Sequence, residues 1–143
     1  MSNRMTRDQR ENFLSGLHVA VLSLNRADRG PLSVPVWYWY EPGGNLWFET
    51  EPNSRKGRLL EVGTRVTLCA QDEAPPYAYV SVEGTVVEIA EDDMELHQIP
   101  LASRYLGQQA GRDYLDSLPP TEWRRYILRP THWHSFDGSK SAV

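Results

Sequence analysis

The sequence has one cysteine and no long apolar segment, and each shortage excludes a class of protein. Cys69 is the single cysteine, so no internal disulfide can form. Its place in an apolar run favours a small buried side chain over a nucleophile. No apolar stretch is long enough to span a membrane, and none follows the basic N-terminal residues as it would in a signal peptide. We therefore expect a cytoplasmic protein with no membrane partner.

The motifs of several enzyme classes are also missing. There is no G-x-S-x-G nucleophile elbow, no G-x-x-x-x-G-K-[ST] phosphate loop and no cluster of cysteine and histidine. His132 and His134 would share one face of a strand, but a lone pair is only half a metal site, and we predict no metal. The net charge of −4 argues against a nucleic-acid partner. The length of 143 residues predicts a single domain over residues 1–143, with flexible tails at 1–5 and 138–143.

Short runs of β-branched and aromatic residues, separated by turn residues, predict a mainly β protein. The first run, residues 18–25, is almost continuously apolar and is expected to be buried on both faces. In the second run, Trp37 and Trp39 should face one side, and Tyr38 and Tyr40 the other. The six predicted strands cover residues 18–25, 32–40, 45–51, 65–71, 77–90 and 122–128, and Gly84 predicts a bend or bulge in the fifth.

Short helices are predicted between and around these strands. They cover residues 6–16, 54–62, 91–106 (divided near Pro100) and 113–118. The fold class that follows is a six-stranded antiparallel barrel, closed or split, with small helices at its ends.

Residues 45–60 carry the feature that bears most directly on function. A strand is followed by a Pro-Asn-Ser turn and by a predicted helix that opens with Arg55, Lys56 and Arg58. A helix N-terminus carries partial positive charge and favours anions, so cations are unexpected there. A bound phosphate would supply the missing negative charge and would accept hydrogen bonds from Ser54 and from free backbone N–H groups. The alternative is a solvated basic face on a surface helix.

The order of these pieces resembles the pyridoxamine 5′-phosphate oxidase-like split β-barrels, the flavin and deazaflavin oxidoreductase superfamily. The resemblance runs from about Leu14 to Phe136. No single piece is a strict signature, but together their order and spacing are typical of the family. The pieces are His18-Val-Ala-Val-Leu-Ser, Leu32-Ser-Val-Pro-Val-Trp-Tyr, Leu46-Trp-Phe-Glu-Thr, Ser54-Arg-Lys-Gly-Arg-Leu-Leu, Gly63-Thr-Arg-Val-Thr-Leu, Tyr79-Val-Ser-Val-Glu-Gly and Pro130-Thr-His-Trp.

The resemblance implies a homodimer with two cofactor sites at the subunit interface. It implies FMN as the cofactor, with the deazaflavin F420 as the alternative and haem as a rarer one. The phosphate would rest on the basic turn, and the ring would lie against the second and third strands. The implied cofactor-binding residues are Val34, Pro35, Val36, Trp37, Thr50, Ser54, Arg55 and Lys56 from one subunit, and Tyr77, Tyr79 and Trp133 from the other.

We therefore predict an FMN- or F420-dependent oxidoreductase, a reductase of a small unsaturated or aromatic substrate. The ring would carry the hydride, while the protein supplies binding, orientation and polarity. Tyr38 or Tyr79 could donate a proton, and no catalytic residue is assigned. The true oxidases end in a Trp- and Arg-rich segment that grips pyridoxal phosphate, and its absence in full argues against that substrate. The alternative function is a non-enzymatic flavin or haem carrier or sensor on the same barrel.

Overall fold

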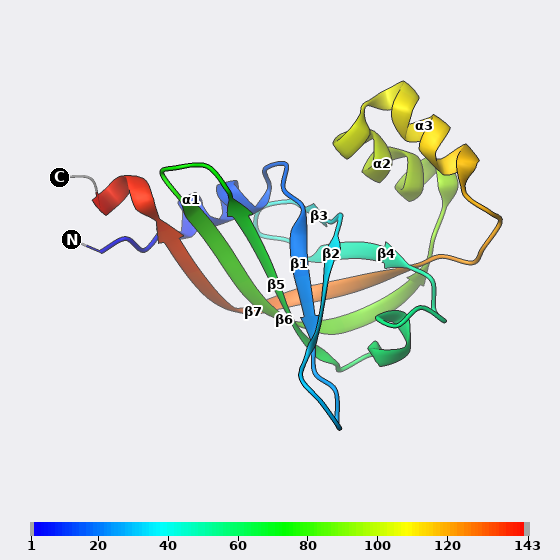
Figure 1. Ribbon diagram of the computed structural model, residues 1–143, viewed down its shortest axis with the longest axis horizontal. Helices are drawn as coiled ribbons and strands as arrows, with labels where there is room; N and C mark the ends of the chain where they lie inside the picture. The colour runs from blue at the N-terminus through cyan, green and yellow to red at the C-terminus, as the bar shows by residue number, and fades with distance from the viewer. Residues whose placement is uncertain (1, 142–143) are drawn as a thin grey trace.

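The computed structural model describes residues 2–141, and its main element is one strongly curved antiparallel sheet (Figure 1). Its strands are β1 (Ala20–Leu24), β2 (Leu32–Val36), β3 (Trp39–Tyr40), β4 (Leu46–Thr50), β5 (Arg65–Asp72), β6 (Ala78–Glu91) and β7 (Arg124–Asp137). Across the sheet the order is β2-β1-β5-β6-β7-β4-β3. Only Trp37 and Tyr38 separate the two edge strands in the chain, so the sheet curls into a barrel that is open between β2 and β3.

The fold class predicted from the sequence is confirmed as mainly β and antiparallel, but the strand count of six is wrong. The predicted strand 32–40 is two strands, because the chain crosses from one sheet edge to the other at Trp37 and Tyr38. At the crossing, the Tyr38 N–H donates to the Tyr105 hydroxyl at 3.0 Å instead of to a neighbouring strand. The predicted alternation of side chains survives the break, since Tyr38 is buried while Trp37 is only partly covered.

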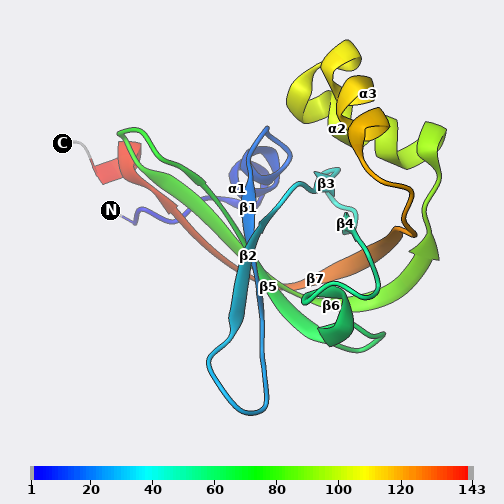
Figure 2. The same cartoon turned by 45° about the vertical axis from the view of Figure 1, so that its right-hand side comes forward.

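The helices are α1 (Arg7–Leu14), α2 (Ile99–Leu106) and α3 (Gln108–Ser117), with a π-turn at Met94–Gln98 and 3₁₀ turns at Gly57–Leu59 and Gly138–Ser141. Helices α2 and α3 pack on each other and stand over one end of the sheet (Figures 1 and 2). Gly111 allows the close approach, since a Cβ there would lie 2.8 Å from the backbone nitrogen of Ser103. The predicted division near Pro100 is confirmed, because the π-turn ends and α2 begins at that point.

The helix predicted over residues 54–62 is wrong, because this segment forms only a three-residue 3₁₀ turn. Ser54 organises the turn: its hydroxyl donates to the Glu51 carbonyl at 2.7 Å and accepts from the Gly57 N–H at 3.0 Å. A turn this short has too few aligned peptides for an appreciable dipole. Whether an anion fits here is therefore decided by where the basic side chains lie.

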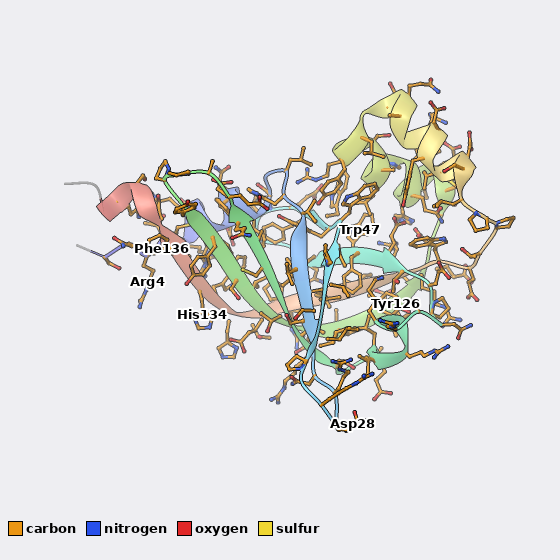
Figure 3. All side chains as sticks on the ribbon, in the orientation of Figure 1. Arg4, Asp28, Trp47, Tyr126, His134 and Phe136 are labelled. Carbon is orange, nitrogen blue, oxygen red and sulfur yellow. The ribbon has the colours of Figure 1, made fainter. Side chains whose placement is uncertain are left out.

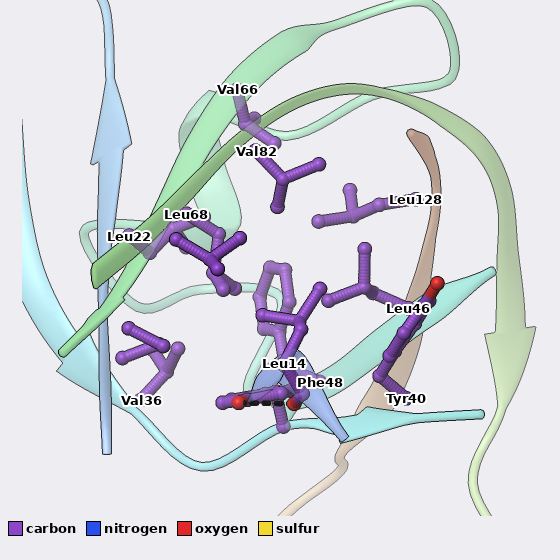
Figure 4. Close-up of a cluster of buried hydrophobic side chains, with 14 of the residues drawn as sticks. Leu14, Leu22, Val36, Tyr40, Leu46, Phe48, Val66, Leu68, Val82 and Leu128 are labelled. Carbon is purple, nitrogen blue, oxygen red and sulfur yellow. Dashed lines mark hydrogen bonds between the residues drawn. The ribbon is translucent and has the colours of Figure 1, made fainter. Parts of the chain in front are cut away.

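Apolar side chains from all sides of the barrel meet in its interior (Figure 4). Leu22, Leu68 and Phe48 are fully buried there, and Leu14 adds a side chain from α1. Each such side chain stabilises the fold by about 1.5–3 kcal/mol relative to an exposed one. The first predicted strand is buried on this inner side only: Val21, which points outward from β1, is 40% exposed. The expectation of burial on both faces is wrong for the chain by itself.

The two longest strands bend where they pass from one half of the barrel to the other. The register of β6 and β7 shifts between Glu83 and Gly84, which confirms the bend predicted at Gly84. Strand β7 continues through Pro130 to Asp137, well beyond the predicted end at residue 128. Pro130 lies opposite Gly84, so the proline falls at the irregularity, where a missing N–H disturbs the ladder least.

Both end segments that were expected to be flexible make contacts in their described parts. The Met5 N–H donates to the Ser135 hydroxyl at 3.0 Å, and the Asp137 N–H donates to the Asn3 carbonyl at 2.8 Å. Lys140 Nζ donates to the Arg4 carbonyl at 2.9 Å. Residues 1, 142 and 143 lie outside the described part of the chain. Within that part, no helix combines the length and the apolar character needed to cross a membrane.

Candidate functional site

A cleft of about 260 Å³ lies between the sheet and the α2–α3 pair. Its walls come from the residue before β1, the link from β2 to β3, the end of β4 with its following turn, and the helices. The lining residues are Val19, Pro35, Val36, Trp37, Glu49, Lys56, Gln98, Leu101, Ala102, Tyr114, Leu115, Leu118 and Trp123. Most of these are apolar or aromatic, and Glu49 and Lys56 are the charged ones. Such a wall suits a flat, largely apolar ring that is oriented by a few polar contacts.

The β2–β3 link forms one wall of the cleft, and α2 and α3 hold it in place. The Trp37 indole stacks on the Tyr105 ring, with ring centroids 4.9 Å apart and an interplanar angle of 7°. It also packs against Tyr114 of α3 at 5.5 Å. The Tyr105 hydroxyl donates to the His18 carbonyl at 2.7 Å, which ties α2 to the start of β1. The Trp37 side of the cleft is therefore a preformed aromatic surface.

The turn after β4 brings Lys56 to the cleft. Thr50 is 2% exposed, and its hydroxyl hydrogen-bonds that of Ser54 at 3.0 Å, which anchors the turn to the end of β4. Burial lowers the pKa of Lys56, while the nearby charge of Glu51 opposes this shift. Within residues 2–141 no salt bridge involves Lys56. A partly desolvated ammonium group without an ion-pair partner favours an anionic ligand.

Glu49 contributes a carboxyl group to the cleft, and it lies beside a second carboxyl group. Asp92, just before the π-turn, has a fully buried side chain within hydrogen-bonding reach of Glu49. Burial raises the pKa of Glu49 to about 9, and the hydrogen bond to Asp92 and the charge of Asp92 add to this shift. The charge of Arg125, the cross-strand partner of Glu49 on β7, opposes it.

Aromatic and basic side chains surround this carboxyl pair. The Arg125 guanidinium lies 5.2 Å from the ring centroid of Trp47, the residue labelled in Figure 3, and Trp47 contacts His97 of the π-turn edge-on at 5.7 Å. His97 Nδ1 lies 3.6 Å from Asp92, but it accepts a hydrogen bond from the Asp93 N–H at 3.1 Å. A ring nitrogen that accepts carries no proton, so His97 does not donate to Asp92.

The structure brings some of the predicted cofactor residues together and leaves others apart. Pro35, Val36, Trp37 and Lys56 line one cleft, and Thr50 and Ser54 lie behind Lys56 in the same turn. Val34 packs against the barrel core, and Arg55 is exposed to solvent. The residues expected from a partner subunit lie away from the cleft: Tyr77 is 58% exposed, Tyr79 stacks on Phe136, and Trp133 packs against Tyr40 and Arg10.

Neither tyrosine considered as a proton donor lines the cleft of its own chain. Tyr38 is fully buried in the barrel, and its hydroxyl donates to the Leu14 carbonyl at 2.6 Å. Burial raises the pKa of Tyr38 well above its ordinary value, which makes proton release harder. Tyr79 lies on β6 with its ring against Phe136.

The sequence analysis missed several cleft residues, and Glu49 is the most important of them. The available signal was a carboxylate at an outward-facing position of an otherwise apolar and aromatic strand, Leu46–Thr50. Gln98, Leu101 and Trp123 gave no such signal, since they come from segments whose positions over the sheet are set by tertiary packing.

A family model described as pyridoxamine 5′-phosphate oxidase matches residues 6–129, which include every strand up to the middle of β7. The chain belongs to the pyridoxamine 5′-phosphate oxidase family. The family resemblance drawn from the strand order is thus confirmed. Among curated proteins, none matches the sequence.

Solved structures share the fold of this family member at low sequence identity. The conserved hypothetical protein Rv2991 from Mycobacterium tuberculosis is 21% identical, with a TM-score of 0.75 over 100% of this chain and 92% of that one. An F420 reductase is 24% identical, with a TM-score of 0.60 over 87% and 94% of the two chains. The FAD and heme binding protein from Mycobacterium smegmatis is 14% identical, with a TM-score of 0.65 over 95% and 73%.

Proposed function

We propose that the protein is an oxidoreductase that binds FMN or F420 in this cleft and reduces a small unsaturated or aromatic substrate there. The observation that carries the proposal is the position of Lys56, a partly buried cation without an ion-pair partner among the described residues, at the edge of an aromatic-walled cleft. In this family member, the cleft offers a place for an anionic group and a flat surface for a ring within reach of one another.

The residues present fit a phosphorylated redox ring. Lys56 would hold the phosphate from the turn that Ser54 orders, and Trp37 with Val36 and Leu101 would support the ring. Glu49 and Gln98 supply polar atoms at the wall for hydrogen bonds to the ring edge. When bound, the ring supplies hydride chemistry, while these side chains bind it, orient it and exclude water.

A homodimer would complete the site, and the surface beside the cleft supports this. The outer side of β1, β5 and the first half of β6 is not covered by any helix of the described chain (Figure 2). Val21 and Tyr79 on this side are each 40% exposed, and Cys69, paired with Val21 across β1 and β5, is partly exposed. Val19 and Pro35 line the cleft and adjoin this surface, so a second copy seated there would reach the cleft.

The cofactor titrations decide between FMN and F420. FMN is the commoner cofactor implied by the family resemblance, while one structural neighbour is named an F420 reductase. A second candidate function is a non-enzymatic carrier or sensor of flavin or haem, which the fold shared with an FAD and heme binding protein supports. Haem fits the cleft less well, because neither His132 nor His134 lines it.

Cofactor titrations test the proposal. Purified protein stripped of small molecules is titrated with FMN, F420 and haem, and binding is followed by ligand fluorescence or absorbance. Removing one charge-assisted phosphate contact costs about 1.5–3 kcal/mol, so Lys56→Ala should weaken FMN or F420 binding roughly 10- to 100-fold.

Arg58→Ala is the matched control, because Arg58 is a cation of the same turn whose side chain is exposed. It should bind within about threefold of the wild type. Equal affinities of the wild type and Lys56→Ala would contradict the assignment of the phosphate position. Absence of flavin and deazaflavin binding in the wild type would contradict the proposed function, and haem binding alone would favour the carrier.

A further inference from the structure

The carboxyl pair at the cleft has no hydrogen-bond donor. Glu49 Oε2 and both oxygens of Asp92 are buried without a hydrogen-bond partner among the described residues. Two ionised carboxylates cannot hydrogen-bond each other, and their repulsion in a dry site is severe. One proton resolves both problems, since it converts the contact into an O–H···O⁻ bond. The buried oxygens without a donor therefore indicate that the pair carries one proton.

The charges of the neighbouring groups favour one bound proton on the carboxyl pair. Arg125 reaches it from β7, and His97, which lies on the π-turn, accepts a backbone N–H and offers the pair no hydrogen bond. Lys56 lines the same cleft from the turn after β4. With one shared proton, the single negative charge of the pair balances the Arg125 guanidinium. Loss of that proton would leave two negative charges against this one cation.

The members of the pair differ in what they face. Glu49 lines the cleft, whereas the Asp92 side chain is 0% exposed and lies behind it. A proton carried by Glu49 can therefore reach a molecule in the cleft, and Asp92 is placed to stabilise the protonated form of its neighbour. Tyr114 is a cleft residue with an acidic hydrogen of its own, and it is the rival donor.

We propose that Glu49 is the proton donor of the reaction in the cleft and that Asp92 is its positioning partner. This rests on the proposed function: a reduced flavin or deazaflavin held by Lys56 and Trp37 would supply a hydride, with both electrons, for one carbon of an activated double bond. The electron pair left on the substrate takes the proton from Glu49, forming the second new bond to hydrogen. The O–H electrons remain on the Glu49 carboxylate, which regains a proton from solvent. The substrate is reduced by two electrons, and the cofactor is oxidised by two.

The first test needs no cofactor. Protein labelled with ¹³C at the glutamate carboxyl carbon is titrated by NMR, and Glu49→Gln identifies the Glu49 signal. We expect that signal to titrate around pH 9 and to move to lower pH in Asp92→Asn, where the charge and the hydrogen bond of Asp92 change together. A midpoint near the ordinary value of about 4.5, or one that Asp92→Asn leaves unmoved, would overturn the proposal.

The second test separates proton transfer from binding. Protein loaded with reduced FMN or F420 is mixed without oxygen with cyclohex-2-enone, an activated alkene, and one turnover is followed. Gln cannot transfer the proton, so Glu49→Gln, measured with saturating cofactor, should slow the step about 100-fold. Glu88→Gln, which removes an exposed carboxylate of β6, is the control and should match the wild type. The turnover rate of the wild type should fall above about pH 9, and that of Asp92→Asn at lower pH.

These outcomes separate the two claims. A wild type that binds neither FMN nor F420 fails the proposed function, whatever the NMR titration shows. A wild type that binds and turns over, while Glu49→Gln reacts at the same rate, overturns the proton donor alone. The proton-donor proposal is also overturned if Tyr114→Phe loses turnover while Glu49→Gln retains it.

Discussion

The outer side of the sheet has two regions that differ in what covers them. At β4 and the first half of β7, helices α2 and α3 and the π-turn lie over the sheet, and charged groups such as Glu49 and Arg125 are held there out of water. At β1, β5 and the first half of β6, the described chain covers nothing, and Val21 and Tyr79 are each 40% exposed.

The difference shows how one sheet supports two tasks. On the covered side, the chain excludes water with its own helices, which makes electrostatic interactions strong and shifts the pKa of Glu49. On the open side, apolar residues are exposed to solvent in the single chain, which is typical of surfaces that bind another protein chain. The cleft lies where the two regions meet, at Val19 and Pro35.

The largest expected effect tests the open side. Val21→Lys places a charge in the centre of the proposed dimer surface, and burial of an unpaired cation should weaken association about 100-fold or more. The free chain should fold normally, since Val21 points outward from β1. Analytical ultracentrifugation over a range of concentrations measures the change.

The control for this variant is Val62→Lys, at a valine of the turn before β5 that is 63% exposed. It should associate like the wild type. A Val21→Lys protein that dimerises normally would show that the open side is not the interface.

The next effect concerns the turn that carries Lys56. A Cβ on Gly57 would overlap the Glu51 carbonyl oxygen, so Gly57→Ala must push the turn off the end of β4. We expect a loss of about 1–3 kcal/mol in the free energy of unfolding, together with weaker cofactor binding. Urea unfolding measures the first effect. Gly30→Ala, at a glycine with open space around it, should change stability by less than about 0.5 kcal/mol. Equal stability of the two variants would contradict the close packing of this turn.

The last prediction tests the covered side through the pH dependence of stability. The pKa of Glu49 is raised in the folded protein to about 9, so its contribution to stability is complete below the unfolded value and is lost as the pH rises toward 9. Glu49→Gln mimics the protonated form and does not titrate. The Tm of Glu49→Gln minus that of the wild type should therefore increase between pH 5 and pH 9. Each kcal/mol of unfolding free energy that the wild type loses over this range should add about 2–4 °C to the difference. A difference in Tm that stays constant over this range would mean that Glu49 is not desolvated.

Much of the barrel follows from local patterns in the sequence. The strand at Leu46–Thr50, the bend at Gly84 and the break near Pro100 each depend on residues close together in the chain, and the structure confirms them. The prediction failed after β4, where a side chain competes with the backbone for hydrogen bonds. The segment after β4 is a 3₁₀ turn because the Ser54 hydroxyl supplies the hydrogen bonds that a longer helix would have made through its backbone.

The candidate site was predictable in part for the same reason. Pro35, Trp37 and Lys56 were expected together from the family resemblance, and they line one cleft. The pairing of Glu49 with Asp92 could not be foreseen, since it joins β4 to the segment before the π-turn. Asp92 looked like a helix-capping residue beside Asp93, but Asp93 alone caps, accepting the Leu96 N–H at 2.8 Å.

The most direct test of the cleft as a cofactor site is a crystal structure of the protein with bound FMN or F420. The ring should lie against Trp37 between the sheet and α2, with its phosphate at Lys56 and its edge toward Glu49. A cofactor bound elsewhere, for example over Tyr77 and Tyr79 with the cleft empty, would contradict the account.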